Sequence, residues 1–176
     1  AIRLNPNNAT IRIRRGNLLF ERRSQAAAME DYDEAIRINP KDATAYNNRG
    51  LARKAMGDVQ GALADYDEAI SLNPEYANAY NNRGSIRKAM GDPDGALADY
   101  NQAIRISPTF SNAYNSRGLI RKAMGDLEGA FDDYSAAIEH NPRYATAYNN
   151  RGAVRFEMRD LDGAIADYSA AIKINP

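Results

Sequence analysis

The chain of 176 residues carries 23 basic and 23 acidic side chains, so its formal net charge at pH 7 is zero. This balance gives no global field that would draw the protein to nucleic acid or to an anionic membrane. The absence of cysteine excludes disulfides and thiol chemistry, and no apolar run approaches the ~20 residues of a membrane span. The single histidine, His140, disfavours a catalytic triad and a zinc site built from nitrogen and sulfur ligands.

A unit of 34 residues repeats along nearly the whole chain. Residues 1–8 match the end of a truncated preceding repeat, and five repeats follow. The first of the five is divergent, and the last lacks its final two residues. They span residues 9–42, 43–76, 77–110, 111–144 and 145–176. A fixed period of this length predicts one continuous solenoid domain, in which each repeat buries its apolar face against its neighbours. Positions within a repeat are called places and are counted from Ala9, Ala43, Ala77, Ser111 and Ala145.

Each repeat is predicted to form two antiparallel helices, called helix A and helix B. In the second repeat helix A covers residues 44–56 and helix B covers residues 60–72. Gly57 between them suits the left-handed conformation that often ends a helix. Asp58 is a good N-cap for helix B, because its carboxylate accepts the unpaired backbone N–H groups. In the divergent first repeat, Ser24 is expected to serve as this cap.

Small and aromatic residues recur at fixed places and predict how the helices pack. Glycine at place eight costs a helix interior about 1 kcal/mol relative to alanine, so its recurrence implies close approach of another helix. Alanine at place 20, tyrosine at place 24 and alanine at place 27 form an apolar stripe along helix B. The glycines are Gly16, Gly50, Gly84, Gly118 and Gly152, and the tyrosines are Tyr32, Tyr66, Tyr100, Tyr134 and Tyr168.

Together with an aromatic at place four and a proline at place 32, these residues resemble the tetratricopeptide repeat family across residues 9–176. The resemblance implies an all-α, right-handed superhelix of helix pairs, in which the A helices line a concave groove. It also implies a non-enzymatic scaffold that binds an extended peptide or protein segment in that groove. One departure concerns place eleven, which is usually a packed aromatic in the family. Here it is Leu19 in the first repeat, then Arg53, Arg87, Arg121 and Arg155.

An arginine at place seven and an aspartate at place 23 occur in every repeat. Their strict co-occurrence favours a structural ion pair between helices A and B over a basic groove for acidic partners. Removing one member of a buried pair is costly even where the pair itself adds little net stability. The predicted pairs are Arg15–Asp31, Arg49–Asp65, Arg83–Asp99, Arg117–Asp133 and Arg151–Asp167.

Asparagine at places five and six and lysine at place twelve are the candidate binding residues. Asparagine is a mediocre helix former, and its amide offers both a donor and an acceptor to a peptide group. The resemblance implies a position at or beside the concave face, where similar asparagine rows in the family bind peptide backbones. The lysines would favour an acidic partner; the alternatives are filler asparagines and solvated lysines. The candidates are Asn47, Asn48, Asn81, Asn82, Asn115, Asn149 and Asn150, with Lys54, Lys88 and Lys122.

Other functions find less support in the sequence. Chaperone-binding members of the family grip a terminal carboxylate with a clamp, of which Asn17 and Asn48 match their places. The clamp lacks its three cations, because Ile13, Asn78 and Asn82 stand where they are needed. No glycine motif for phosphate binding occurs, and the near-neutral composition disfavours recognition of one RNA base per repeat. We therefore expect no catalytic residue, no cofactor and no metal.

Two further hypotheses remain open at this stage. One is a substrate-selecting or targeting array of a larger enzyme whose catalytic domain is absent, and the other is a self-assembly module that forms a homo-oligomer through its terminal repeats. The second hypothesis follows from the absence of the polar caps that solenoids usually need, with Tyr168 and Ile172 near an unprotected end. No signal peptide is visible, and we favour the cytoplasm as the compartment.

Overall fold

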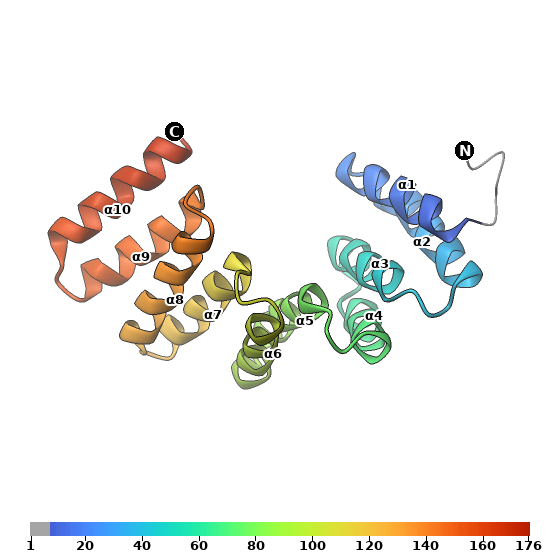
Figure 1. The fold of residues 1–176 in the computed structure, drawn as a ribbon, viewed down its shortest axis with the longest axis horizontal. Coiled ribbons are helices and arrows are strands. Elements are labelled where there is room, and N and C mark those ends of the chain that lie inside the picture. Colours follow the sequence, from blue (N-terminus) through green and yellow to red (C-terminus); the bar gives the residue numbers. More distant parts are fainter. Residues whose placement is uncertain (1–7) are drawn as a thin grey trace. The chain divides into compact units, whose positions relative to one another are not determined.

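The computed structural model describes residues 8–176, and all regular secondary structure in this range is α-helical (Figure 1). The end of a preceding repeat, predicted for residues 1–8, lies outside the described residues except for Asn8. The helices in chain order are α1 (Ala9–Glu21), α2 (Gln25–Ile38), α3 (Ala43–Ala55), α4 (Val59–Leu72), α5 (Ala77–Ala89), α6 (Pro93–Ile106), α7 (Ser111–Ala123), α8 (Leu127–His140), α9 (Ala145–Glu157) and α10 (Leu161–Ile174).

Helices α1 and α2, α3 and α4, α7 and α8, and α9 and α10 pair as the repeats predict, with the odd-numbered helices as A helices and the even-numbered ones as B helices. The second repeat shows how close the predicted bounds were, because α3 begins and ends one residue earlier than expected and α4 begins one residue earlier. The chain divides into two compact units, one ending at Ile86 and the other beginning at Arg87, within α5. A single continuous solenoid domain over 9–176 stays a prediction.

The turn between the two helices of a repeat needs a residue with positive φ. Gly57 has φ of 85°, and Gly91 and Gly125 take the same conformation. In the first and last repeats Arg23 and Arg159 occupy this position with φ of 59° and 67°. A side chain in the left-handed region costs about 1 kcal/mol or more, so these two turns are more strained than the glycine turns.

Aspartate caps helix B wherever the sequence provides it. Asp58 Oδ1 accepts a hydrogen bond from the backbone N–H of Gly61, and the caps of α6, α8 and α10 repeat the bond. The first repeat departs from the expectation. Ser24 occupies the N-cap of α2, but its side chain makes no capping hydrogen bond.

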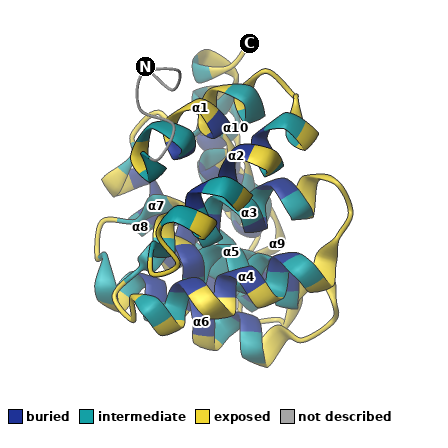
Figure 2. Cartoon of the chain, turned by 90° about the vertical axis from the view of Figure 1, so that its right-hand side faces the viewer, coloured by how far each residue is buried: buried dark blue, intermediate teal, exposed yellow. Residues whose placement is uncertain are grey.

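The core is a series of small clusters at the junctions between repeats. One kind of cluster joins the alanine at place 20 and the tyrosine at place 24 of one helix B to the residue at place ten of the next helix A, and a second kind joins the alanine at place 27 to the alanine at place three of the next helix A. Ala62 and Tyr66 of α4 meet Ile86 of α5 in the first way, and Ala130 and Tyr134 of α8 meet Val154 of α9. Figure 2 shows the resulting pattern, in which helices carry buried residues on one side and exposed residues on the other.

The glycine at place eight makes room for the tyrosine ring of the same repeat. A Cβ atom at Gly50 would lie 2.7 Å from Cε1 of Tyr66, and one at Gly118 would lie 2.8 Å from Cε1 of Tyr134. The prediction of a close helix approach at this place is therefore confirmed. The atoms that approach the glycine belong to the aromatic ring, whereas the alanine at place 20 packs against the following repeat.

Candidate functional site

The asparagines of places five and six form hydrogen-bonded bridges between successive A helices. Asn47 is 3% exposed, and its Oδ1 accepts a hydrogen bond of 3.0 Å from Nδ2 of Asn82 on the next A helix. Asn115 is equally buried and accepts a bond of 2.9 Å from Asn150. The bridge recurs at a spacing of 35 residues, from place five to place six of the following repeat. Place-five side chains in these two repeats therefore hold their neighbours in position and are shielded from solvent.

The first repeat completes the same bridge with a different residue. Place five is Ile13 there, and Nδ2 of Asn48 instead donates to Oδ1 of Asn17, at 2.9 Å. The hydroxyl of Tyr32 donates to the same oxygen, also at 2.9 Å. Asn47 donates to Oδ1 of Asn48 at 3.0 Å, which fixes that amide from its other side. The place-six side chains of Asn48, Asn82 and Asn150 keep intermediate exposure, whereas Asn149 of α9 is exposed.

Two of the lysines at place twelve, Lys54 and Lys122, reach toward the next A helix. Nζ of Lys54 donates to Oγ of Ser85 at 2.8 Å, and Nζ of Lys122 forms an ion pair of 2.9 Å with Glu157. Lys88 is exposed. We call the surface formed by places six, nine, twelve and thirteen of the A helices the A-helix face.

The aspartate at place 23 is buried in every repeat, and in the first, second, fourth and fifth repeats it lies between two arginines. In the second repeat Arg49 donates from Nε and Nη2 to Asp65, at 3.0 and 2.6 Å. Nη1 of Arg53 lies 3.0 Å from the same carboxylate and donates to the carbonyl of Gly61. The fourth and fifth repeats have the same arrangement around Asp133 and Asp167. The arginine at place eleven, unusual for the resembled family, thus serves as the second partner of a buried charge.

Sequence reasoning missed this second arginine, although the first repeat carries a signal for it. Place eleven is Leu19 there, and Arg12 at place four, where the other repeats have tyrosine, lies 3.2 Å from Asp31 instead. Arg15 also pairs with Asp31, as predicted from the spacing. Two departures from the repeat pattern therefore compensate for each other. In the third repeat Asp99 pairs with Arg87 and Arg83 pairs with Asp67, and the Arg83–Asp99 pair stays a prediction.

The arginine at place seven also reaches back to the preceding helix B, at place 25. Nη1 of Arg49 donates to Asp33 at 2.7 Å, and Nη1 of Arg117 donates to Oδ1 of Asn101 at the same distance. Arg151 makes the corresponding bond to Oγ of Ser135 at 3.1 Å. The acidic residues of the B helices thus pair with basic residues of the A helices, which accounts for much of the charge segregation in the sequence.

The charge environment of the core keeps its tyrosines neutral and its arginines charged. Burial raises the pKa of Tyr32 to about 12, with smaller contributions from the negative charges of Asp31 and Glu21. Burial also raises the pKa of Tyr100 to about 12, although a hydrogen bond with Ser116 acts in the opposite direction. Burial disfavours the charge of Arg49, but its hydrogen bonds to two aspartates outweigh this and raise its pKa.

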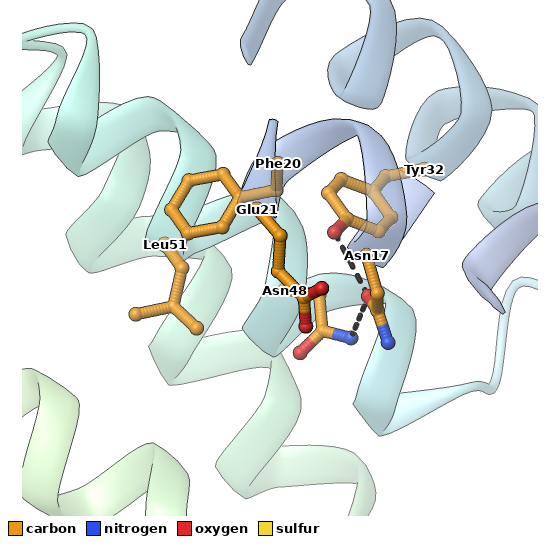
Figure 3. Close-up of a pocket in the computed structure, with 6 residues that line it drawn as sticks. All are labelled: Asn17, Phe20, Glu21, Tyr32, Asn48 and Leu51. Carbon is orange, nitrogen blue, oxygen red and sulfur yellow. Dashed lines mark hydrogen bonds between the residues drawn. The ribbon is translucent and has the colours of Figure 1, made fainter. Parts of the chain in front are cut away.

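A pocket of about 200 Å³ opens on the A-helix face of the first unit (Figure 3). Its lining comes from α1, α2 and α3 and combines two apolar side chains with amides, a hydroxyl and a carboxylate. The lining residues are Asn17, Phe20, Glu21, Tyr32, Asn48 and Leu51.

Other kinds of site are not indicated by the described residues. No group of histidine, aspartate and glutamate side chains within residues 8–176 has the arrangement needed to hold a metal ion. None of the helices in this range combines the length and apolar character that a bilayer crossing requires.

Solved structures with the same fold include several repeat proteins. YrrB, described as "a TPR protein with an unusual peptide-binding site", is 23% identical, with 99% of this chain and 90% of that chain covered and a TM-score of 0.70. PilF of Pseudomonas aeruginosa is 16% identical, with coverage of 96% and 77% and a TM-score of 0.90. TTC0263 of Thermus thermophilus is 20% identical, with coverage of 96% and 92% and a TM-score of 0.79.

Family models match most of the sequence, although no curated protein sequence matches it. The model described as "TPR repeat" matches residues 16–57, 52–91 and 118–159, and the model described as "Tetratricopeptide repeat" matches residues 77–110 and 145–176. The helix pairs, the fixed places of the repeat and these matches agree. The chain belongs to the tetratricopeptide repeat family, whose all-α superhelix of helix pairs serves as a protein-interaction scaffold.

Proposed function

We propose that the chain holds extended peptide segments on its A-helix face, with the place-six asparagines bonding the peptide backbone. The observation that carries the proposal is that the asparagines at places five and six differ in burial and in role. Buried Asn47 and Asn115 fix the amides of Asn82 and Asn150, which stay accessible. A binding group that is already oriented loses less conformational entropy when a ligand arrives.

The remaining hydrogen-bonding capacity of these amides suits a peptide group. Asn82 uses one of its two N–H groups in the bridge to Asn47, and its amide has a second N–H and an oxygen acceptor besides. A peptide backbone offers one acceptor and one donor per residue. The lysines at place twelve add positive charge beside the asparagines, so acidic side chains would be favoured in the bound segment. The charge of Lys122 is already offset by Glu157, so Lys122 adds little to this preference.

A random peptide display library, selected on the wild-type chain, supplies probes for the test. The selected peptides are then measured by fluorescence polarisation against a triple variant with Asn48→Ala, Asn82→Ala and Asn150→Ala. Three lost hydrogen bonds of about 1 kcal/mol each should weaken binding at least tenfold. Binding that persists unchanged in the triple variant would show that the asparagine mechanism is wrong.

Two controls separate binding from stability in this experiment. Asn149→Ala should leave peptide affinity unchanged, because Asn149 lines a hollow at the C-terminal end of the second unit, with Thr146 and Ile172. A second triple variant carries serine at place six, as the chain itself does at Ser116. It should lose affinity like the alanine variant, and thermal unfolding should show that both remain folded.

A second candidate function, head-to-tail self-association, is favoured by the two terminal repeats. Place ten is buried in the second to fifth repeats, and in the last of these Val154 is fully covered by Ala130 and Tyr134 of the preceding helix B. Leu18 holds this place in the first repeat and is 60% exposed. At the other end Ile172 is 65% exposed, whereas its equivalent Ile138 is 9% exposed. We infer that Leu18 of one copy packs on α10 of another as Val154 packs on α8.

Such a contact joins two different surfaces, so it produces open chains of copies and not closed dimers. Sedimentation velocity should therefore show a weight-average mass that keeps rising with concentration. Leu18→Lys should abolish the rise, whereas Met56→Lys, at a side chain of similar exposure in an inter-helix turn, should not. A wild-type chain that stays monomeric at high concentration would rule out this function.

A further inference from the structure

The pocket between α1 and α3 differs in charge from the equivalent places of the second, third and fourth repeats. Places twelve and thirteen are Phe20 and Glu21 in the first repeat, but a lysine followed by an alanine in the next three; the fifth repeat again has Phe156 and Glu157. The A-helix face therefore carries a carboxylate and an aromatic ring at the first repeat, where the next three repeats carry an ammonium group.

Internal cations span the equivalent space elsewhere in the chain. Lys54 crosses from α3 to Ser85 of α5, and Lys122 crosses from α7 to Glu157 of α9. Glu157 also stands at place thirteen, but it meets Lys122 of the preceding A helix, whereas Glu21 lines a pocket on the side of the following A helix. Within the described residues no cation pairs with Glu21, and the space beside it is the open pocket.

The remaining walls favour one kind of cation. Phe20 and Leu51 form an apolar side, and the carboxylate of Glu21 lies above Asn48 in Figure 3. Both lone pairs of Asn17 Oδ1 are used by Tyr32 and Asn48, so the polar groups that remain for a ligand are the Asn17 amide N–H groups, the Asn48 oxygen and the Glu21 carboxylate. A planar guanidinium can stack on an aromatic ring and donate to a carboxylate at the same time, which a compact ammonium does less well.

The volume and the surrounding charges agree with a single side chain as the occupant. About 200 Å³ is less than the roughly 300–1,000 Å³ of pockets that enclose small molecules. Arg14, exposed on α1, precedes Glu21 by seven residues, which is about 10 Å along a helix. This is about one Debye length at physiological ionic strength, so its repulsion of a bound cation is largely screened.

We propose that this pocket binds an arginine side chain of the partner peptide, with the guanidinium stacked on Phe20 and ion-paired with Glu21. The proposal rests on the proposed function and also sets the orientation of the bound peptide segment. A bound segment would carry arginine at the first repeat and acidic residues beside the lysine of the second. This combination distinguishes a partner of mixed charge from the uniformly acidic one that the lysines alone suggest.

The probe for the test is N-acetyl-arginine methylamide, compared with its lysine and citrulline analogues. Citrulline keeps the shape of arginine but carries no charge. Titrations followed by NMR on the side-chain amides of Asn17 and Asn48 should show saturable shifts with arginine and binding at least about fivefold weaker with citrulline. Glu21→Gln should weaken arginine binding by a similar factor without changing citrulline binding.

Two variants make the result specific to the pocket. Glu157→Gln removes the carboxylate at the same place of the last repeat and should leave arginine binding unchanged. Phe20→Leu should reduce the preference for arginine over lysine, because the aromatic face is lost and the apolar wall is kept. Equal binding of citrulline and arginine, or full arginine binding by Glu21→Gln, would overturn the proposal.

Selection of peptides on the wild-type chain and on Glu21→Gln separates this proposal from the function on which it rests. Arginine enriched only in peptides selected on the wild-type chain supports both. Peptides recovered equally by both chains, without arginine enrichment, overturn the pocket and leave the scaffold function standing. If neither chain selects a peptide while the arginine probe still binds in a manner that depends on Glu21, the scaffold function fails and the pocket stands.

Discussion

Asp65 and Asp67 lie two residues apart on α4, and each pairs with an arginine, yet their burial differs sharply. The side chain of Asp65 is 3% exposed and that of Asp67 is 53% exposed. We predict that Asp65→Asn destabilises the chain by about 3–5 kcal/mol, because it leaves two arginines beside a neutral group in the core. Asp67→Asn should cost about 1 kcal/mol or less, since exposed ion pairs contribute little.

Another repeat of the chain supports the small free-energy cost predicted for Asp67→Asn. Asn101 stands at the place of Asp67 in the third repeat and accepts the same hydrogen bond from an arginine, at 2.7 Å. Urea denaturation followed by circular dichroism measures both variants, at low and at high salt. Salt should reduce the effect of Asp67→Asn and leave that of Asp65→Asn nearly unchanged, because buried charges are screened much less. Equal losses in the two variants would refute the assignment of a buried structural charge to Asp65.

Three further predictions concern packing, turns and pH. Gly50→Ala should destabilise the chain by about 1 kcal/mol in urea denaturation. The new methyl group costs ~1–3 kcal/mol of overpacking against the buried ring of Tyr66, which exceeds the ~1 kcal/mol gain in helix propensity. A stabilised variant would contradict the close packing. Arg159→Gly should raise the thermal midpoint, because glycine removes the strain of a side chain in the left-handed region. After subtraction of the larger entropy that glycine gives the unfolded chain, the net stabilisation should be about 0.5 kcal/mol. A lower midpoint would contradict this. The free energy of unfolding should fall between about pH 10 and about pH 12, because unfolded tyrosines ionise near 10 while Tyr32 and Tyr100 ionise near 12. Urea midpoints and tyrosinate absorbance measured together would check this, and a midpoint that stays constant above pH 10 would refute it.

The sequence was sufficient for the architecture because the architecture repeats. Each packing place occurs in five copies, so a residue such as the glycine at place eight stands out even though one glycine alone would mean little. The bounds of α3 and α4 were predicted to within one residue, since Gly57 and Asp58 mark the turn between them. Caps, turns and core stripes are local, and local rules were enough to find them.

The candidate site was harder to predict because its contacts cross from one repeat to the next. The bridge between Asn47 and Asn82 depends on which side chain of one A helix meets which side chain of the following one, and the spacing alone does not reveal this register. The spacing likewise does not reveal that Arg49 reaches back to Asp33 of the preceding repeat. Arg12 was a further missed residue, although its exchange with Leu19 in a single repeat was visible as a paired departure from the pattern.

The arginine at place seven has a consequence for cooperativity. In a one-dimensional array, stability divides into an intrinsic free energy of each repeat and an interface term between neighbours. The acceptor on the preceding repeat changes along the chain from the carboxylates of Asp33 and Asp67 to the amide of Asn101 and the hydroxyl of Ser135, while the bond to the aspartate of the same repeat is kept in the second, fourth and fifth repeats. Only the interface term declines along this series. Repeats near the N-terminus should therefore open together in hydrogen exchange, whereas those near the C-terminus should open one at a time.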